Sequence, residues 1–377
     1  MRAGQPSQTA RGAAALRAIH QTLEGGVIFR DPYAARILDD ETRAGLDAMA
    51  ADASLRPLRL LIAARSRFSE GALAACVARG VRQVVILGAG LDTFSLRNPH
   101  AGLGVRVFEV DYPATQDWKR ERLAQAGLAV PDTLTFAPID FERQGLADGL
   151  AAAGFHADRP AFFQWLGVVP YLSRDAISQT LHFIAGVPES EVVFDYGEPF
   201  ENYPEERRAN VMAVAERAAA RGEPWLSQFD PAEMSDLLHE AGFAVIEDLG
   251  MAALSERFYG ALKKHARIGP GAHVVRAERC SASKSSTWLW LQMHLICPSG
   301  CFARGVSSPF FKNFSSFRFM QITFLVPAVH PTRGAYRDRH GRGAGCGGRG
   351  GALDEQRQSG RRSRVVLTPR RWRQVGS

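Results

Sequence analysis

The sequence predicts an α/β protein with a doubly wound, largely parallel sheet of seven strands, an antiparallel last strand and a cap of helices. Short apolar runs alternate with helical stretches from Val81 to Ala277, as in parallel strands joined by right-handed crossovers. Residues 250–271 separate the last two runs and hold no long amphipathic pattern, which favours an antiparallel pair. Helical stretches also precede the first run, and these predict the cap.

Three helices are predicted in this N-terminal cap. Residues 11–23 are rich in alanine, carry apolar side chains at helical spacing, and are followed by Gly25-Gly26, which ends the helix. Asp31-Pro32 has the residue types of a helix start, so a second helix is expected there. One long helix is expected over residues 55–80.

The strands are predicted where apolar and β-branched residues cluster between turn residues. They cover residues 84–87, 105–111, 133–138, 160–166, 192–196, 243–249 and 272–277. Helices are expected between them at residues 112–127, 146–153, 204–221 and 231–241, and another begins at its cap Ser173 with apolar side chains as far as Ile184.

The loop after the first strand has the residues that a nucleotide site requires. The strand runs into Gly88-Ala89-Gly90, where the backbone can turn sharply and approach a ligand closely. Thr93 stands where a dinucleotide motif has its third glycine, which disfavours a nicotinamide cofactor. Glycine pairs are common in turns, so the position directly after a strand gives this one its significance.

Two acidic residues end the next two strands. Asp111 follows Gly90 by 21 residues and could accept hydrogen bonds from both hydroxyls of an adenosine ribose. Its alternatives are a helix cap or a solvated strand end. Asp140 could meet the amino group of adenine, with Phe141 offering its amide or ring to the base. A turn residue is the alternative for Asp140.

Arg65 and Arg67 lie on the long helix that leads to the first strand. A guanidinium there could bind a cofactor carboxylate through two hydrogen bonds, or it could pair with Glu70 on the helix surface. Tyr171 and His20 are the candidates for a general base, and each could equally be a packed structural side chain.

These residues make the chain similar to the leucine carboxyl methyltransferase family, and most of all to its bacterial S-adenosyl-L-methionine-dependent methyltransferases. The resemblance covers roughly residues 7–279. The motifs that carry it are the Ala-Ala-Leu-Arg-Ala helix with Asp31-Pro32, Arg65-Ser-Arg67-Phe68, Gly80–Thr93, Phe108–Pro113 and Gly167-Val-x-x-Tyr171-Leu172.

The resemblance implies a class I methyltransferase (Rossmann-like) fold with S-adenosyl-L-methionine as cofactor. It implies that Arg65 holds the methionine carboxylate, Gly88 and Gly90 the cofactor along the loop, Asp111 the ribose, and Asp140 with Phe141 the adenine. Leu166 stands where the family often has a glutamate that faces the cofactor.

The expected reaction is O-methylation of a carboxylate or hydroxyl on a small molecule or peptide end. A carboxylate is already ionised at neutral pH and needs no base, whereas a phenol or alcohol is helped by one, for which Tyr171 is the candidate. The cap and residues 197–230 are expected to line the acceptor pocket. The alternatives are an NAD(P)-dependent oxidoreductase on a similar fold and a non-catalytic nucleic-acid binder.

Charge divides the chain into two parts. Residues 280–377 hold 16 Lys and Arg against 3 Asp and Glu, whereas residues 1–279 hold 30 against 36. We therefore interpret residues 1–80 as the cap, 81–279 as the cofactor-binding core and 280–377 as an appended, largely disordered Arg/Gly-rich tail. Translation past a lost stop codon or a frameshift would produce such a tail; a nucleic-acid-binding arm and an ordered extra element are the alternatives.

The remaining composition suggests a cytoplasmic protein with no resident metal. No apolar run is long enough for a membrane span, and the first 15 residues lack the apolar region of a secretory signal. Cys297 and Cys301 lack a partner pair at zinc spacing. Cys76, on the long predicted helix, is expected to be a small core residue.

Overall fold

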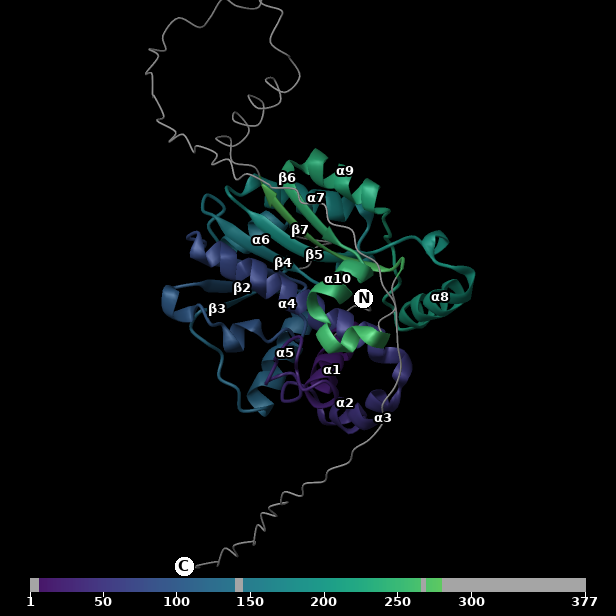
Figure 1. Cartoon of the computed structure of the whole chain (residues 1–377). Coiled ribbons are helices and arrows are strands. Elements are labelled where there is room, and N and C mark those ends of the chain that lie inside the picture. Colours follow the sequence, from purple (N-terminus) through teal and green to yellow (C-terminus); the bar gives the residue numbers. More distant parts are fainter. Residues whose placement is uncertain (1–6, 140–144, 266–268, 280–377) are drawn as a thin grey trace, which may run out of the picture. The chain divides into compact units, whose positions relative to one another are not determined.

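The computed structural model describes residues 7–139, 145–265 and 269–279. Its strands form one sheet in the order β3-β2-β1-β4-β5-β7-β6, shown in Figure 1. Their bounds are β1 Gln83–Leu87, β2 Arg106–Asp111, β3 Leu134–Pro138, β4 Ala161–Trp165, β5 Glu191–Gly197, β6 Phe243–Leu249 and β7 Ala272–Arg279. Each predicted strand is confirmed.

The pairing directions confirm the predicted fold class. Strands β1 to β5 pair in parallel, and β7 runs antiparallel to both of its neighbours, β5 and β6. This is the strand arrangement that the resemblance to class I methyltransferases implies. The strand order reverses at β1, so the glycine loop at its end lies at the switch point where open sheets bind ligands.

Helices cover both faces of the sheet because the buried strands are apolar on both sides. On β1, Val84 and Ile86 pack with α4 (Arg56–Ala78) and α10 (Met251–Phe258). Val85 and Leu87 belong to the other core, with α6 (Leu146–Ala152), α7 (Arg174–Gly186) and α9 (Pro231–Ala241). The glycine loop is thus fixed by a strand buried on both sides.

The N-terminal helices before β1 are α1 (Gln8–Leu23), α2 (Asp40–Ala44), α3 (Leu46–Ala51) and α4. The helix expected at Asp31-Pro32 is wrong: residues 32–36 form turns, and helix starts again only at Asp40. The carboxylate of Asp31 is buried and accepts hydrogen bonds from Arg17 at 2.9 Å and Thr93 at 2.7 Å. It also accepts the N–H of Tyr33 at 3.1 Å, so the local cap forms, but only turns follow it.

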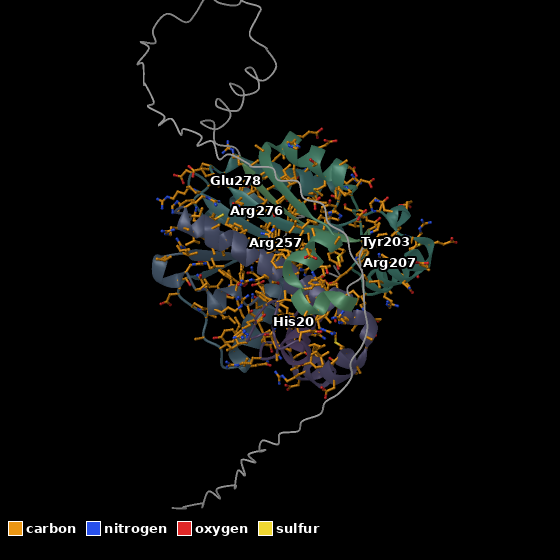
Figure 2. The ribbon with its side chains drawn as sticks, viewed as in Figure 1. His20, Tyr203, Arg207, Arg257, Arg276 and Glu278 are labelled. Atoms are coloured by element: carbon orange, nitrogen blue, oxygen red, sulfur yellow. The ribbon has the colours of Figure 1, made fainter. Side chains whose placement is uncertain are left out.

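The chain between β5 and α9 projects to one side of the sheet as α8 (Glu205–Ala220), at the right of Figure 1. At its base the guanidinium of Arg207 lies 5.5 Å from the ring centre of Tyr203, and both are labelled in Figure 2. Residues 221–230 then return from α8 to the sheet edge. This return brings distant side chains to the start of α1 and to the turn after β4.

The remaining helix of the alternating part is α5 (Pro113–Gln125), which follows β2. Among the helices that the structure describes, none is both long and apolar enough to span a membrane. Two predictions fall elsewhere: Asp140 and Phe141, and the tail at 280–377, lie outside the described residues.

Candidate functional site

The glycine loop after β1 is shaped by two residues with positive φ. Gly88 has φ +65°, and a Cβ atom there would lie 2.3 Å from Cγ2 of Val168. Gly90 has φ +46°, and a Cβ there would lie 2.7 Å from that of Ala10, in the first turn of α1. Both positions therefore require glycine. The glycine loop lies directly against α1 and against the segment that follows β4.

Asp111 ends β2 beside this loop. One carboxylate oxygen accepts the N–H of Gly90 at 2.6 Å, and the other accepts the N–H of Tyr112 at 2.7 Å. The side chain is 6% exposed, and burial raises its pKa to about 6. It is neither a solvated strand end nor a helix cap, because its bonds fix the glycine loop.

Arg65 reaches the same edge of the sheet from α4. Its Nη1 donates to Asp195 on β5 at 2.7 Å, and the other oxygen of Asp195 accepts the N–H of Gly167 at 2.6 Å. A Cβ at Gly167, where φ is +73°, would lie 2.8 Å from Nη2 of Arg65. The guanidinium is thus held flat against the backbone that follows β4.

Arg65 and Arg67, the two candidate arginines on the long helix, lie in different environments in the structure. Arg67 is exposed, whereas Arg65 is half-buried at the site. Neither pairs with Glu70, which instead accepts two hydrogen bonds from Arg97, at 2.8 and 2.5 Å. Of the two, Arg65 is the one available to a cofactor carboxylate.

A buried polar network supports the residues just after the glycine loop. Lys119 on α5 donates to Glu109 on β2 at 2.6 Å and to the carbonyl of Asp92 at 2.7 Å. Gln164 on β4 donates to the carboxylate of Asp92 at 3.1 Å. Sequence reasoning missed this network, although a Glu and a Gln within apolar strands were its signal.

Tyr171 lies in the short 3₁₀ turn that follows β4. Its hydroxyl has hydrogen bonds with the side chains of Thr9 on α1 and Trp225, and burial raises the pKa of the phenol. The residue therefore reaches the site, as predicted, but its hydroxyl is neutral at physiological pH. In that state it is a hydrogen-bonding group and a poor base.

Glu223 is a site residue that the sequence did not reveal. It lies in the return segment after α8, is 7% exposed, and accepts the N–H groups of Gln8 and Thr9 at 3.0 Å each. Those donors open the first turn of α1, where a carboxylate is stabilised by the unpaired N–H groups and the helix dipole. No local pattern links residues so far apart.

His20 does not belong to this group. It is fully buried in α1 (Figure 2), with Nδ1 3.1 Å from a carboxylate oxygen of Glu24, and Nε2 accepts the N–H of Phe29 at 3.4 Å. Burial lowers its pKa. The structural interpretation of His20 thus fits, because its neutral ring joins α1 to the following loop.

The sheet edge therefore brings Arg65, Gly88, Gly90, Asp111 and Tyr171 together. Leu166, where the resemblance led us to note a missing glutamate, is partly buried and packs on the α4 side of the core. Asp195, one strand further on, supplies a carboxylate beside Arg65 instead.

Comparison with known proteins gives a family match. The sequence model for leucine carboxyl methyltransferase matches residues 10–185. A Bacillus subtilis protein named "Putative S-adenosyl-L-methionine-dependent methyltransferase YktD" is 34% identical over 216 residues, covering 57% of this chain and 71% of that protein. A Mycobacterium avium protein named as the same kind of methyltransferase is 38% identical over 183 residues. That match spans 45% of this chain and little more than half, 57%, of the mycobacterial protein.

Two solved structures resemble the chain. A DUF574 family protein from Streptomyces avermitilis is 18% identical with a TM-score of 0.46, covering 71% of this chain and 97% of that chain. A magnesium protoporphyrin IX methyltransferase from Synechocystis, solved with bound SAH, is 16% identical with a TM-score of 0.37 and covers 59% of this chain and 86% of that chain.

Proposed function

The chain belongs to the leucine carboxyl methyltransferase family, and we propose that it methylates an oxygen atom, a carboxylate or hydroxyl on a small molecule or peptide end. It is an S-adenosyl-L-methionine-dependent methyltransferase. The alternative function that the sequence left open, an NAD(P)-dependent oxidoreductase, is therefore set aside. The acceptor and the residues that bind each partner are our proposal.

The groups at the sheet edge fit this cofactor by their chemistry. Arg65 offers a guanidinium for the methionine carboxylate, and Asp111 offers carboxylate oxygens for the ribose hydroxyls. Gly88 and Gly90 let the cofactor lie close to the loop backbone between them. Asp140 and Phe141, which follow β3 in the sequence, are proposed to meet the adenine.

The state of Tyr171 carries our choice of acceptor. The residue is partly buried, and this burial raises the pKa of its phenol, which therefore does not remove protons at neutral pH. The nearby carboxylates are engaged: Asp195 pairs with Arg65, and Glu223 with backbone N–H groups. An acceptor that is already ionised suits such a site, and a carboxylate meets this condition.

When bound, the cofactor would supply an electrophilic methyl group on a sulfonium, for transfer to an acceptor oxygen with S-adenosyl-L-homocysteine as the leaving product. The protein's task is to align the acceptor and exclude water. We assign the cap at 1–80 and residues 197–230 to the acceptor pocket, 81–279 to the cofactor-binding core, and 280–377 to an appended tail. Nucleic acid is not proposed as a partner.

Calorimetry followed by a transfer screen tests this proposal. The purified chain is titrated with S-adenosyl-L-methionine and with S-adenosyl-L-homocysteine, and both are expected to bind. Methyl transfer is then screened over carboxylates and phenols, with carboxylates expected to react. Absence of heat and of a thermal shift with both ligands would contradict the cofactor site, and transfer to nitrogen or carbon acceptors alone would contradict the acceptor class.

A further inference from the structure

Three segments that are far apart in the sequence meet beside the glycine loop. They are residues 7–10 at the start of α1, 167–172 after β4, and 223–227 in the return from α8; we call them the collar. The carbonyl of Pro170 accepts the N–H of Leu226 at 2.7 Å, and Ser227 donates to the carbonyl of Leu172 at 2.5 Å. These bonds join the second and third segments.

The first segment is joined to the other two by side chains. The hydroxyl of Tyr171 has hydrogen bonds with Thr9 in the first segment and Trp225 in the third. Glu223 makes the stronger link, because its carboxylate accepts two backbone N–H groups, from Gln8 and Thr9. Hydrogen bonds to a charged group contribute more than those between neutral groups.

The next residue of α1 touches the cofactor loop itself. Ala10 lies where a Cβ at Gly90 would be only 2.7 Å away, so the first turn of α1 rests on the loop. Gly90 in turn donates to Asp111. A continuous set of contacts thus runs from Glu223 through α1 and the glycine loop to the carboxylate proposed to bind the ribose.

We propose that Glu223 is a positioning residue, which holds the first turn of α1 against the glycine loop and keeps Thr9 beside Tyr171 and Trp225 in the collar. The proposal rests on the proposed function, because it takes the cofactor to lie on the glycine loop. Glu223 contacts neither the cofactor nor the acceptor, and it acts through α1. We expect this arrangement to slow the release of bound cofactor.

Hydrogen exchange and cofactor dissociation test this role in the full chain. In Glu223→Gln, the side-chain oxygen still accepts one of the two N–H groups of α1. The side-chain NH2 group, which is a donor, faces the other N–H and cannot accept it. We expect exchange at residues 8–12 to rise about tenfold in the ligand-free protein, as for a lost helix cap. Dissociation of S-adenosyl-L-homocysteine, followed by stopped-flow tryptophan fluorescence, is expected to accelerate by a similar factor. Glu223→Asp, which keeps the charge, should restore part of both effects.

A matched control is Glu233→Gln, which removes a carboxylate that pairs with Arg174 outside the collar. It should change neither measurement. Faster exchange at residues 8–12 with unchanged dissociation would make Glu223 a purely structural cap and overturn the proposal, as would unchanged exchange in Glu223→Gln. If the wild-type chain binds no S-adenosyl-L-homocysteine, the proposed function fails, and the exchange data still decide separately whether Glu223 holds α1.

Discussion

Asp111 accepts a hydrogen bond of 2.6 Å from the N–H of Gly90 and so connects the end of β2 to the glycine loop after β1. The N–H of Tyr112 occupies its other oxygen at 2.7 Å. These two donors fix the orientation of a carboxylate that burial would otherwise disfavour. The geometry of the loop and the charge state of Asp111 are therefore linked.

Replacing Asp111 should weaken cofactor binding. Asp111→Ala removes both the proposed ribose contact and the acceptor for Gly90, so we expect the Kd for S-adenosyl-L-methionine to rise about tenfold or more. Calorimetric titration measures the change. Asp117→Ala, at an exposed position on α5, is the control and should bind normally. Unchanged affinity in Asp111→Ala would mean that the ribose contact is misassigned.

The pH dependence of binding should follow Asp111. In the proposed contact the ribose hydroxyls would donate to its ionised form, whereas its pKa in the ligand-free protein is about 6. The Kd for S-adenosyl-L-homocysteine is therefore expected to rise about tenfold for each pH unit below 6, and to be level above pH 7. Asp111→Asn should bind weakly with a flatter profile. An equally steep profile in this variant would assign the titration to another group.

The same raised pKa predicts a loss of stability as pH rises. The folded protein holds the Asp111 proton more tightly than the unfolded chain, so this group lowers the free energy of unfolding progressively from about pH 4 to pH 6, by up to about 3 kcal/mol. Above pH 6 the free energy of unfolding stays lower by this full amount. The difference in Tm between wild type and Asp111→Asn, measured from pH 4 to 8, should change over this window.

Removing the guanidinium of Arg65 should cost affinity and stability together. In Arg65→Ala the buried carboxylate of Asp195 loses its cation, and the cofactor loses its proposed partner, so we expect binding to weaken by about tenfold to a hundredfold and the Tm to fall. Arg67→Ala, two residues along the same helix and exposed, should change neither. Equal effects of the two substitutions would remove Arg65 from the site.

Gly88→Ala should destabilise the chain by steric overlap that a second substitution partly relieves. The new Cβ would lie 2.3 Å from Val168 at a φ of +65°, and we expect a loss of about 2–3 kcal/mol in the free energy of unfolding. Val168→Ala in the same chain should recover part of it, and chemical denaturation measures the coupling. Gly102→Ala, with open space around it, is the control. Strict additivity would contradict the contact.

His273 should give the stability of the fold a second dependence on pH, which arises from a base held between two carboxylates. Its Nδ1 lies 2.7 Å from Asp248 and its Nε2 3.2 Å from Glu198, so the imidazolium can donate to both carboxylates and its pKa is raised. This stabilisation is complete below about pH 6.5 and is lost as pH rises through the folded-state pKa. His273→Gln should remove this part of the Tm profile, and His182→Gln, at an exposed position, should leave it intact.

The strands could be predicted because each is a short apolar run between turn residues, and β1, β2, β4 and β5 are buried along almost their whole length. The antiparallel end followed from the absence of a long amphipathic pattern in residues 250–271. The helix at Asp31-Pro32 could not be judged in the same way. Its start signal is real in local terms, but Arg17 and Thr93 take the carboxylate of Asp31. The carboxylate also caps the adjacent turn by accepting the N–H of Tyr33 at 3.1 Å, but no helix follows that turn.

The site was predictable where its residues sit at strand ends and missed where they meet only by folding. Gly88 and Asp111 follow directly from their positions after β1 and β2. Glu223 has partners 214 and 215 residues away, and Asp195 meets an arginine 130 residues earlier, so no spacing reveals either. An acid within the apolar run Val-Val-Phe-Asp-Tyr was the single local signal for Asp195.

The position of β7 also has a consequence for synthesis. This strand is made after β6 yet lies between β5 and β6, so β5 presents an unpaired edge until residues 272–279 have left the ribosome. Unpaired strand edges recruit other chains during folding. A nascent chain that stops before Ala272 would keep that edge open, and we expect such fragments to aggregate instead of accumulating as folded intermediates.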